Sequence, residues 1–152
     1  MTTFLPMDEG AQARLGACIA RHCAPGTVLH LEGDLGAGKT TLTRGFIQGL
    51  GHDGRVKSPT YTLIEPYEVA GLRLLHLDLY RLSDPEELEY LGLRDHLDGE
   101  SILLIEWPER GGGLLPPADL RVVIDHLDEG RRVTLMPLTP LGERLAADCA
   151  GC

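Results

Sequence analysis

A glycine-rich segment at residues 33–40 carries the clearest chemical signal in the sequence. It reads Gly-Asp-Leu-Gly-Ala-Gly-Lys-Thr and fits the phosphate-binding pattern G-x-x-x-x-G-K-[ST] at every position. Glycines let successive backbone N–H groups turn toward one anion, and the helix that follows adds its positive dipole end. In such a loop Lys39 would reach the β- and γ-phosphates, and the Thr40 hydroxyl would ligate Mg²⁺. We therefore predict a site for Mg-ATP. The predicted contacts are Gly33, Asp34, Leu35, Gly36, Ala37, Gly38, Lys39, Thr40 and Thr41.

Two acidic residues stand at the ends of apolar runs that are typical of buried strands. Asp78 ends the run Leu-Leu-His-Leu-Asp, and Glu106 ends the run Ile-Leu-Leu-Ile-Glu. A phosphate-loop site needs a further acidic group to hold Mg²⁺ or its waters, and strand ends in an open α/β sheet border the ligand crevice. We therefore predict that Asp78 and Glu106 bind the metal and, with Lys39, act in catalysis. For each acid alone, a solvated carboxylate that caps a strand is the competing interpretation.

Three further residues are candidates for contacts with the nucleotide. Thr60 lies in a hydroxyl-rich segment, residues 58–62, that would form a switch loop sensing the γ-phosphate; a plain turn into a strand is the alternative. Trp107, the only tryptophan, directly follows Glu106, and packing in the core or rim competes with a role in the site. Arg131 stands at the start of the last predicted strand, where a surface role competes with a nucleotide contact.

Apolar periodicity and turn signals predict the elements that must position these residues. The phosphate loop lies between a predicted strand at 28–31 and a predicted helix at 40–50, as phosphate binding requires. Extended segments are also predicted at 60–69, 72–80 and 101–105, a hairpin at 120–127 and 132–138, and helices at 8–22, at 84–97 with a break near Gly92, and at 142–150.

These elements predict a single P-loop ATPase domain over residues 1–152. We expect an α/β, P-loop NTPase-like three-layer sandwich, with a mixed, mostly parallel sheet and helices on both faces. The late hairpin is the reason to expect a mixed sheet. Residues 139–152 are expected to form either the terminal helix or a loosely ordered tail.

Composition and charge restrict the partners. The 152 residues are 43% hydrophobic and 24% charged, as in one globular domain. We see no apolar run long enough to cross a membrane and no signal-peptide pattern, so we expect a cytoplasmic protein without membrane contact. The formal net charge is −9, and residues 61–152 carry 8 basic and 18 acidic side chains. Direct binding to DNA or tRNA is therefore not expected, because proteins that grip a polyanion usually present a basic surface.

Four cysteines are present: Cys18, Cys23, Cys149 and Cys152. The C-x-x-C spacing of the last pair admits a four-cysteine zinc site as an alternative. That pair stands at the end of the chain, where chains fray, and the chain has enough core residues to fold without disulfides. We therefore predict free thiols. The six histidines lack metal-ligand spacing, and we assign them no role.

Four motifs in order along the chain resemble those of the TsaE (formerly YjeE) family of bacterial ATPases. They are residues 33–41, 58–63 (Ser-Pro-Thr-Tyr-Thr-Leu), 76–82 (His-Leu-Asp-Leu-Tyr-Arg-Leu) and 105–109 (Ile-Glu-Trp-Pro-Glu). The last three motifs are more specific than the phosphate loop alone. No motif position departs from the pattern, and the resemblance runs from about residue 8 to 138.

The resemblance implies a role in forming N6-threonylcarbamoyladenosine (t6A) at position 37 of tRNAs that read codons beginning with A. Family members are weak ATPases that work with TsaB-type and TsaD-type proteins, so tRNA would be reached only through these partners. The resemblance also implies that Lys39 and Thr40 bind phosphate and Mg²⁺, and that Asp78 and Glu106 serve the metal and the attacking water. It places Trp107 beside the nucleotide and makes residues 58–62 the switch.

Two other functions stay open on the residues alone. A small P-loop metabolite kinase would need an arginine-rich lid and an acceptor pocket, and no such lid stands out. A nucleotide-gated interaction module would bind ATP with negligible hydrolysis. Because no arginine finger is evident, we expect hydrolysis on the order of turnovers per minute or less.

Overall fold

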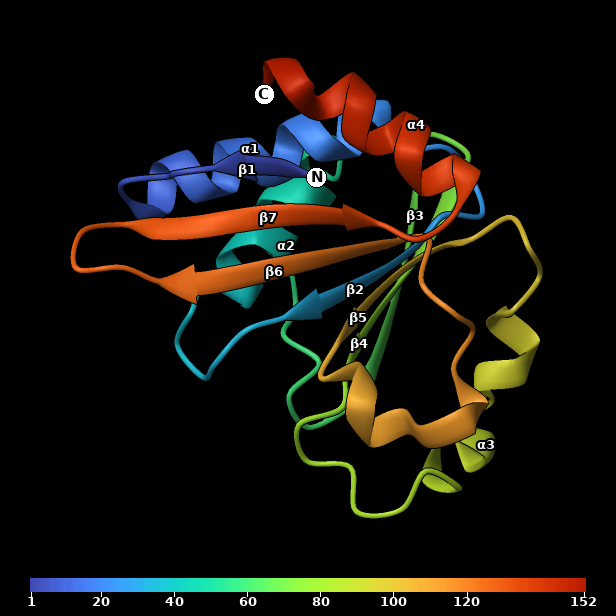
Figure 1. The fold of residues 1–152 in the computed structure, drawn as a ribbon. Coiled ribbons are helices and arrows are strands. Elements are labelled where there is room, and N and C mark those ends of the chain that lie inside the picture. The colour runs from blue at the N-terminus through green and yellow to red at the C-terminus, as the bar shows by residue number, and fades with distance from the viewer.

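The computed structural model describes residues 1–152 and has one seven-stranded sheet with helices packed on it (Figure 1). The strands are β1 (Thr2–Phe4), β2 (Val28–Glu32), β3 (Ile64–Val69), β4 (Leu72–Asp78), β5 (Ile102–Glu106), β6 (Leu120–His126) and β7 (Arg131–Pro137). The α-helices are α1 (Glu9–His22), α2 (Lys39–Gly49), α3 (Glu87–Tyr90) and α4 (Pro140–Asp148). Short 3₁₀ helices span Leu93–His96, Pro108–Leu114 and Cys149–Gly151. No helix is long and apolar enough to span a membrane.

The sheet is mixed, as predicted, with the strand order β1-β7-β6-β2-β5-β4-β3. Its centre is parallel, because β2 pairs with both β5 and β6, and β4 pairs with β5 in the same direction. The outer pairings β1–β7, β6–β7 and β3–β4 are antiparallel. Half of the pairings are therefore antiparallel, so the expectation of a mostly parallel sheet holds only for the four central strands. The carboxyl ends of β2, β4 and β5 consequently lie at one edge.

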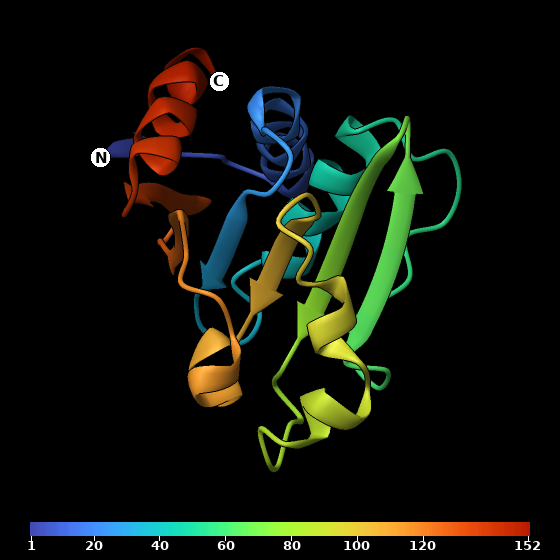
Figure 2. The same ribbon diagram turned by 90° about the vertical axis from the view of Figure 1, so that its right-hand side faces the viewer.

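Period-two alternation along the strands separates the residues of the two faces. In β5, Ile102 and Leu104 join a core cluster of 20 residues, whereas Leu103 and Ile105 join a cluster of 10 on the opposite face. Helices α1, α2 and α4 contribute to the larger cluster, and α3 and the Leu93–His96 turn contribute to the smaller. Figure 2 shows the short helical segments, in yellow and orange, on the side of the sheet away from α1 and α2. Helices thus cover both faces, but unequally.

Glycines allow α1 to pack closely against α2. A Cβ on Gly16 of α1 would lie 2.1 Å from the carbonyl oxygen of Leu42, and one on Gly45 of α2 would lie 2.0 Å from that of Ala13. Neither position can therefore carry a side chain without moving one of the two backbones. This contact fixes the direction of α2, and with it the loop that precedes the helix.

The structure differs from the expected elements in three segments. The predicted helix at 84–97 is reduced to α3 and a 3₁₀ turn, separated by Gly92 in the left-handed region with φ 79°. Residues 60–63 of the expected extended segment form a turn, and β3 starts only at Ile64. Residues 139–152 are not a loose tail: Thr139 caps α4 by accepting a hydrogen bond from the Gly142 N–H, and Leu145 and Ala146 are buried.

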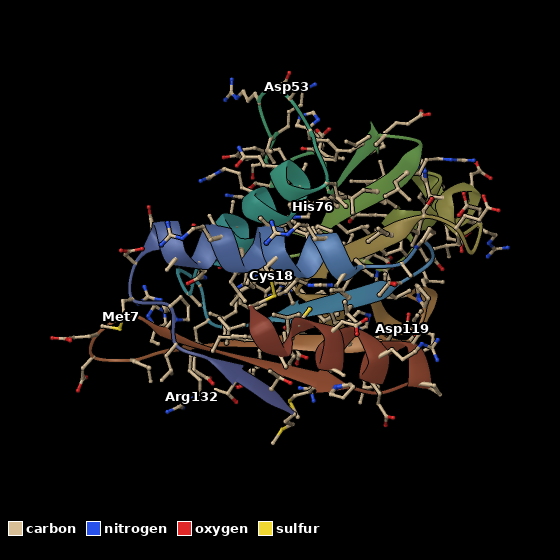
Figure 3. The ribbon with its side chains drawn as sticks, turned by 90° about the horizontal axis from the view of Figure 1, so that it is seen from above. Met7, Cys18, Asp53, His76, Asp119 and Arg132 are labelled. Atoms are coloured by element: carbon tan, nitrogen blue, oxygen red, sulfur yellow. A yellow bond between two sulfur atoms is a disulfide. The ribbon has the colours of Figure 1, made fainter.

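The expectation that all four cysteines are free thiols is wrong for one pair. Cys18 of α1 and Cys152 form a disulfide with a Cα–Cα distance of 5.9 Å, and Figure 3 labels Cys18 on its helix. Cys23 and Cys149 are free, and burial raises the pKa of the Cys23 thiol to about 12. The pair is close in space only because α4 packs beside α1, and the sequence contains no signal for that contact. The sulfur atoms are divided between a disulfide and free thiols, so they do not form the alternative four-cysteine zinc site.

Candidate functional site

The glycine-rich loop connects the end of β2 to the start of α2, as its spacing predicts. Gly38, the residue before α2, adopts φ 100°, and a Cβ there would lie 2.3 Å from Nε2 of Gln12. The Gln12 amide donates hydrogen bonds to the carbonyls of Gly38 (2.8 Å) and Ala37 (3.3 Å). The Arg131 Nε–H also donates to the Ala37 carbonyl, at 3.2 Å. Because each peptide bond is trans, the N–H groups of Gly38 and Lys39, which follow these two carbonyls, point away from Gln12 and Arg131.

Two residues therefore support the loop from outside. Arg131 was predicted as a nucleotide contact, and the structure shows it bonded to the loop itself. Gln12 was not predicted at all. Its signal is a polar side chain on the apolar face of α1, where it is only 3% exposed. Buried amides need partners, and here the partners are the loop carbonyls.

The Lys39 side chain folds back across its own loop. Its Nζ donates to the carbonyls of Gly33 (2.6 Å) and Asp34 (3.1 Å), and it lies 4.3 Å from the centroid of the Trp107 ring. Burial lowers the pKa of Lys39, and the charge of Glu106 opposes that shift. The Lys39 ammonium group is thus partly desolvated and lies among two carbonyl oxygens and an aromatic face. An anion that binds in the loop would replace these carbonyl oxygens as the partner of the ammonium group.

Asp78 and Glu106 lie next to each other at the carboxyl ends of the parallel strands β4 and β5, paired in register. They are 9% and 2% exposed, so neither is a solvated strand cap. Burial, and then the charge of Glu106, raise the pKa of Asp78, while the N–H of Tyr80 donates to its Oδ1 at 3.1 Å. A cation bound beside Asp78 would offset this repulsion by the charge of Glu106.

A cleft of about 460 Å³ brings most of the predicted residues together. It is lined by Leu35, Gly36, Gly38, Lys39, Thr40, Thr41, Thr60, Asp78, Glu106 and Trp107. The remaining predicted residues lie beside it: Gly33 and Asp34 line a neighbouring hollow with Trp107, and Ala37 and Arg131 line a second cavity on the α1 side of the loop. That second cavity, of about 170 Å³, shares Gly36, Gly38 and Thr41 with the main cleft.

Trp107 has a strained backbone conformation; it directly follows Glu106 in the chain, and its ring contacts Lys39. Its φ of 56° and ψ of 52° place a bulky residue in the left-handed region, which costs on the order of 1–3 kcal/mol. The turn aims the indole across Lys39, and the Tyr80 ring lies 5.1 Å away. Packing in the core or rim was the competing interpretation, and Trp107 does both: it lines the cleft and packs, partly buried, against the smaller core cluster.

Residues 58–62 reach the cleft through Thr60. Thr60 lines the cleft, its hydroxyl 2.6 Å from that of Ser58, whereas Tyr61 is 83% exposed. Arg81 also lines the cleft, although the sequence offered no arginine finger. Its guanidinium lies over the Tyr61 ring at 4.8 Å from the centroid. An arginine is therefore present at the site, and an exposed ring holds it.

His76 is a further residue that the sequence analysis left without a role. It lies in β4 two residues before Asp78, and its side chain and that of Glu106 are 1% and 3% exposed. Its Nε2 is 2.6 Å from Oε2 of Glu106, and its Nδ1 has no hydrogen-bond partner. A histidine inside an apolar strand, on the same face as a predicted catalytic acid, was the available signal.

Comparisons with known proteins identify the family to which this site belongs. The family model "Threonylcarbamoyl adenosine biosynthesis protein TsaE" matches residues 7–134. The chain belongs to the TsaE family. The tRNA threonylcarbamoyladenosine biosynthesis protein TsaE of Haemophilus influenzae is 51% identical over 150 residues, covering 95% of this chain and 94% of the relative. The Bacillus subtilis protein of the same name is 43% identical over 148 residues, covering 97% and 89%.

A solved structure supports the same assignment. The crystal structure of Bacillus subtilis YdiB superposes with a TM-score of 0.82 at 33% sequence identity, covering 98% of this chain and 93% of that chain. The TsaE resemblance inferred from four short motifs is thereby confirmed over nearly the whole chain. The TsaE family takes part in the biosynthesis of threonylcarbamoyladenosine in tRNA.

Proposed function

We propose that this TsaE-family chain binds Mg-ATP on residues 33–41 and hydrolyses it slowly during formation of t6A at adenosine 37 of tRNA. One observation carries the proposal. The phosphate-loop lysine and two buried carboxylates from neighbouring strand ends, Asp78 and Glu106, line one cleft. Phosphoryl transfer needs a phosphate cradle, a cation to neutralise charge and a group that orients water, and this set supplies a residue for each task.

The oxygen atoms available in the cleft suit Mg²⁺. This ion binds one or two carboxylates together with substrate phosphates, and here Thr40, Asp78 and Glu106 would hold it. The raised pKa of Asp78 fits this role, because a bound cation would stabilise the ionised form of this carboxylate. When bound, the ion would supply positive charge beside the β- and γ-phosphates. The acid that does not ligate it directly would orient the attacking water.

The nucleotide would cross the loop from one cavity to the other. Its phosphates would meet Lys39 and the N–H groups at the start of α2. Its base and ribose would enter the second cavity, between residues 6–9 and Arg131. Gln12 and Arg131 would act there by holding the loop carbonyls, and Arg131 would also border the nucleotide.

The pathway role rests on the family, and charge favours an indirect contact with tRNA. The net charge of −9 disfavours a polyanion, so we propose that TsaB-type and TsaD-type proteins bring the chain to tRNA in the cytoplasm. Slow basal turnover fits the position of Arg81, whose guanidinium is held over Tyr61. A partner that moves this ring would free the arginine.

The test is an assay of phosphate release with and without the two partner proteins. We expect the chain alone to turn over on the order of once per minute or less, and the partners to change that rate. A gel-shift with tRNA at about 100 mM salt should show no complex with the chain alone. A rate indifferent to both partners, together with transfer of phosphate to a metabolite, would favour the small-kinase alternative. Tight tRNA binding by the isolated chain would contradict the indirect contact.

A further inference from the structure

The pair formed by His76 and Glu106 is buried at the sheet, and of the two only Glu106 lines the cleft. His76 is in β4 and Glu106 is the last residue of β5, and both side chains project from the face of the sheet that α2 covers. The hydrogen bond between Nε2 and Oε2 is 2.6 Å long, and its two side chains are 1% and 3% exposed. A short contact to a carboxylate in such surroundings restricts the rotation of the acid strongly.

The surroundings of the ring indicate which nitrogen carries the hydrogen. Oε2 of Glu106 is a hydrogen-bond acceptor and Nε2 lies 2.6 Å from it, so we take Nε2–H as the donor. Nδ1 is fully buried without a partner. A hydrogen on Nδ1 would be a buried donor without an acceptor, which is costlier than an unpaired lone pair, so the surroundings favour the hydrogen on Nε2.

Oε1, the second carboxylate oxygen of Glu106, is not held by His76. Oε1 makes no hydrogen bond within the chain, and it is not among the fully buried unpaired polar atoms. It therefore keeps contact with solvent, and the cavity that Glu106 lines is the main cleft beside Lys39 and Thr40. One carboxylate oxygen is thus held by His76, and the other is open to the cleft.

We propose that His76 is a positioning residue that holds Oε2 of Glu106 and thereby directs Oε1 toward the metal and water of the cleft. The inference rests on the proposed ATP hydrolysis. His76 does not line the cleft, and its hydrogen bond is to Glu106, so it would act through Glu106. Removing the donor should therefore reduce turnover while nucleotide affinity, which depends on the loop and α2, stays unchanged.

The test compares two substitutions that differ in one hydrogen bond. His76→Gln keeps an N–H donor close to the position of Nε2, and His76→Leu removes it at similar volume. We expect His76→Leu to lower kcat by roughly 10- to 100-fold with the Kd for Mg-ATP within about threefold, and His76→Gln to retain most of the parental kcat. Melting temperatures separate this effect from unfolding.

A double-mutant cycle gives a readout that a purely structural role would not move. In the Glu106→Gln background, His76→Leu should cause little further loss of kcat, because the two residues act as a unit. His30→Leu is the matched control: His30 is in β2, its ring contacts the Pro116 carbonyl at 3.3 Å, and kcat should not change.

Two outcomes would overturn the proposal while leaving the proposed function intact. One is a His76→Leu variant that is folded and has the parental kcat. The other is full additivity of His76→Leu and Glu106→Gln. A parent chain without any ATP turnover would instead refute the proposed function, and this inference with it.

Discussion

The two sides of the cleft are built in opposite ways. On one side Lys39, Asp78 and Glu106 are 5%, 9% and 2% exposed, and each stands at the end or start of a sheet strand or helix. On the other side, in residues 58–62, the Ser58 and Thr60 hydroxyls bond to each other, the Thr62 hydroxyl donates to Glu65, and Tyr61 is 83% exposed. The first side is fixed by the same core that fixes the fold. The second is fixed by a few local bonds.

This difference separates what the fold supplies from what a ligand or partner must supply. The buried side is assembled in advance, since strand register sets Asp78 beside Glu106 and the loop bonds hold Lys39 nearby. Preorganised charges cost no rearrangement at the moment of reaction. The exposed side has little to hold it, so it is suited to respond to a γ-phosphate or to another protein. Substitutions should therefore act most strongly on the buried side.

The largest effect on turnover is expected from the two acids. Asp78→Asn and Glu106→Gln should keep nucleotide binding and lower hydrolysis by at least about 100-fold, because the site loses a metal ligand or the group that orients water. Phosphate release under saturating Mg-ATP measures this, and calorimetry checks binding. If either variant turns over at the parental rate, that residue plays no part in the reaction and only ends a strand.

A smaller effect is expected on the exposed side. Thr60→Ala should lower kcat by roughly 3- to 10-fold, because the proposed switch would lose one hydroxyl that could contact the γ-phosphate. Thr62→Ala is the matched control, since the Thr62 hydroxyl donates to Glu65 at 3.1 Å and does not line the cleft. A Thr60→Ala loss as large as that of Glu106→Gln would remove the distinction between the two sides.

The parts of the site that the sequence predicted are those in which local pattern determines position. The phosphate loop, α2 and the acids at the strand ends follow from glycine spacing and apolar runs, because each acid directly continues its own strand. The short α3 was harder to predict. Acidic residues and Pro85 favour a helix start, but Gly92 and the small area of this face end it early.

The missed residues depend on contacts between distant segments. Gln12 supports the loop only because glycines bring α1 against α2, and His76 meets Glu106 only because β4 and β5 are neighbours. The Cys18–Cys152 disulfide joins residues separated by 134 positions. Periodicity within one segment contains no information about which other segment packs beside it, so none of these contacts could be derived from spacing.

The central claim is that residues 33–41 bind Mg-ATP, and calorimetric titration of the parent chain and Lys39→Ala tests it most directly. The account predicts saturable binding by the parent and a Kd at least about 10-fold weaker for Lys39→Ala, because one charge-assisted contact to phosphate is worth ~1.5–3 kcal/mol. A folded Lys39→Ala variant that binds Mg-ATP as tightly as the parent would contradict it.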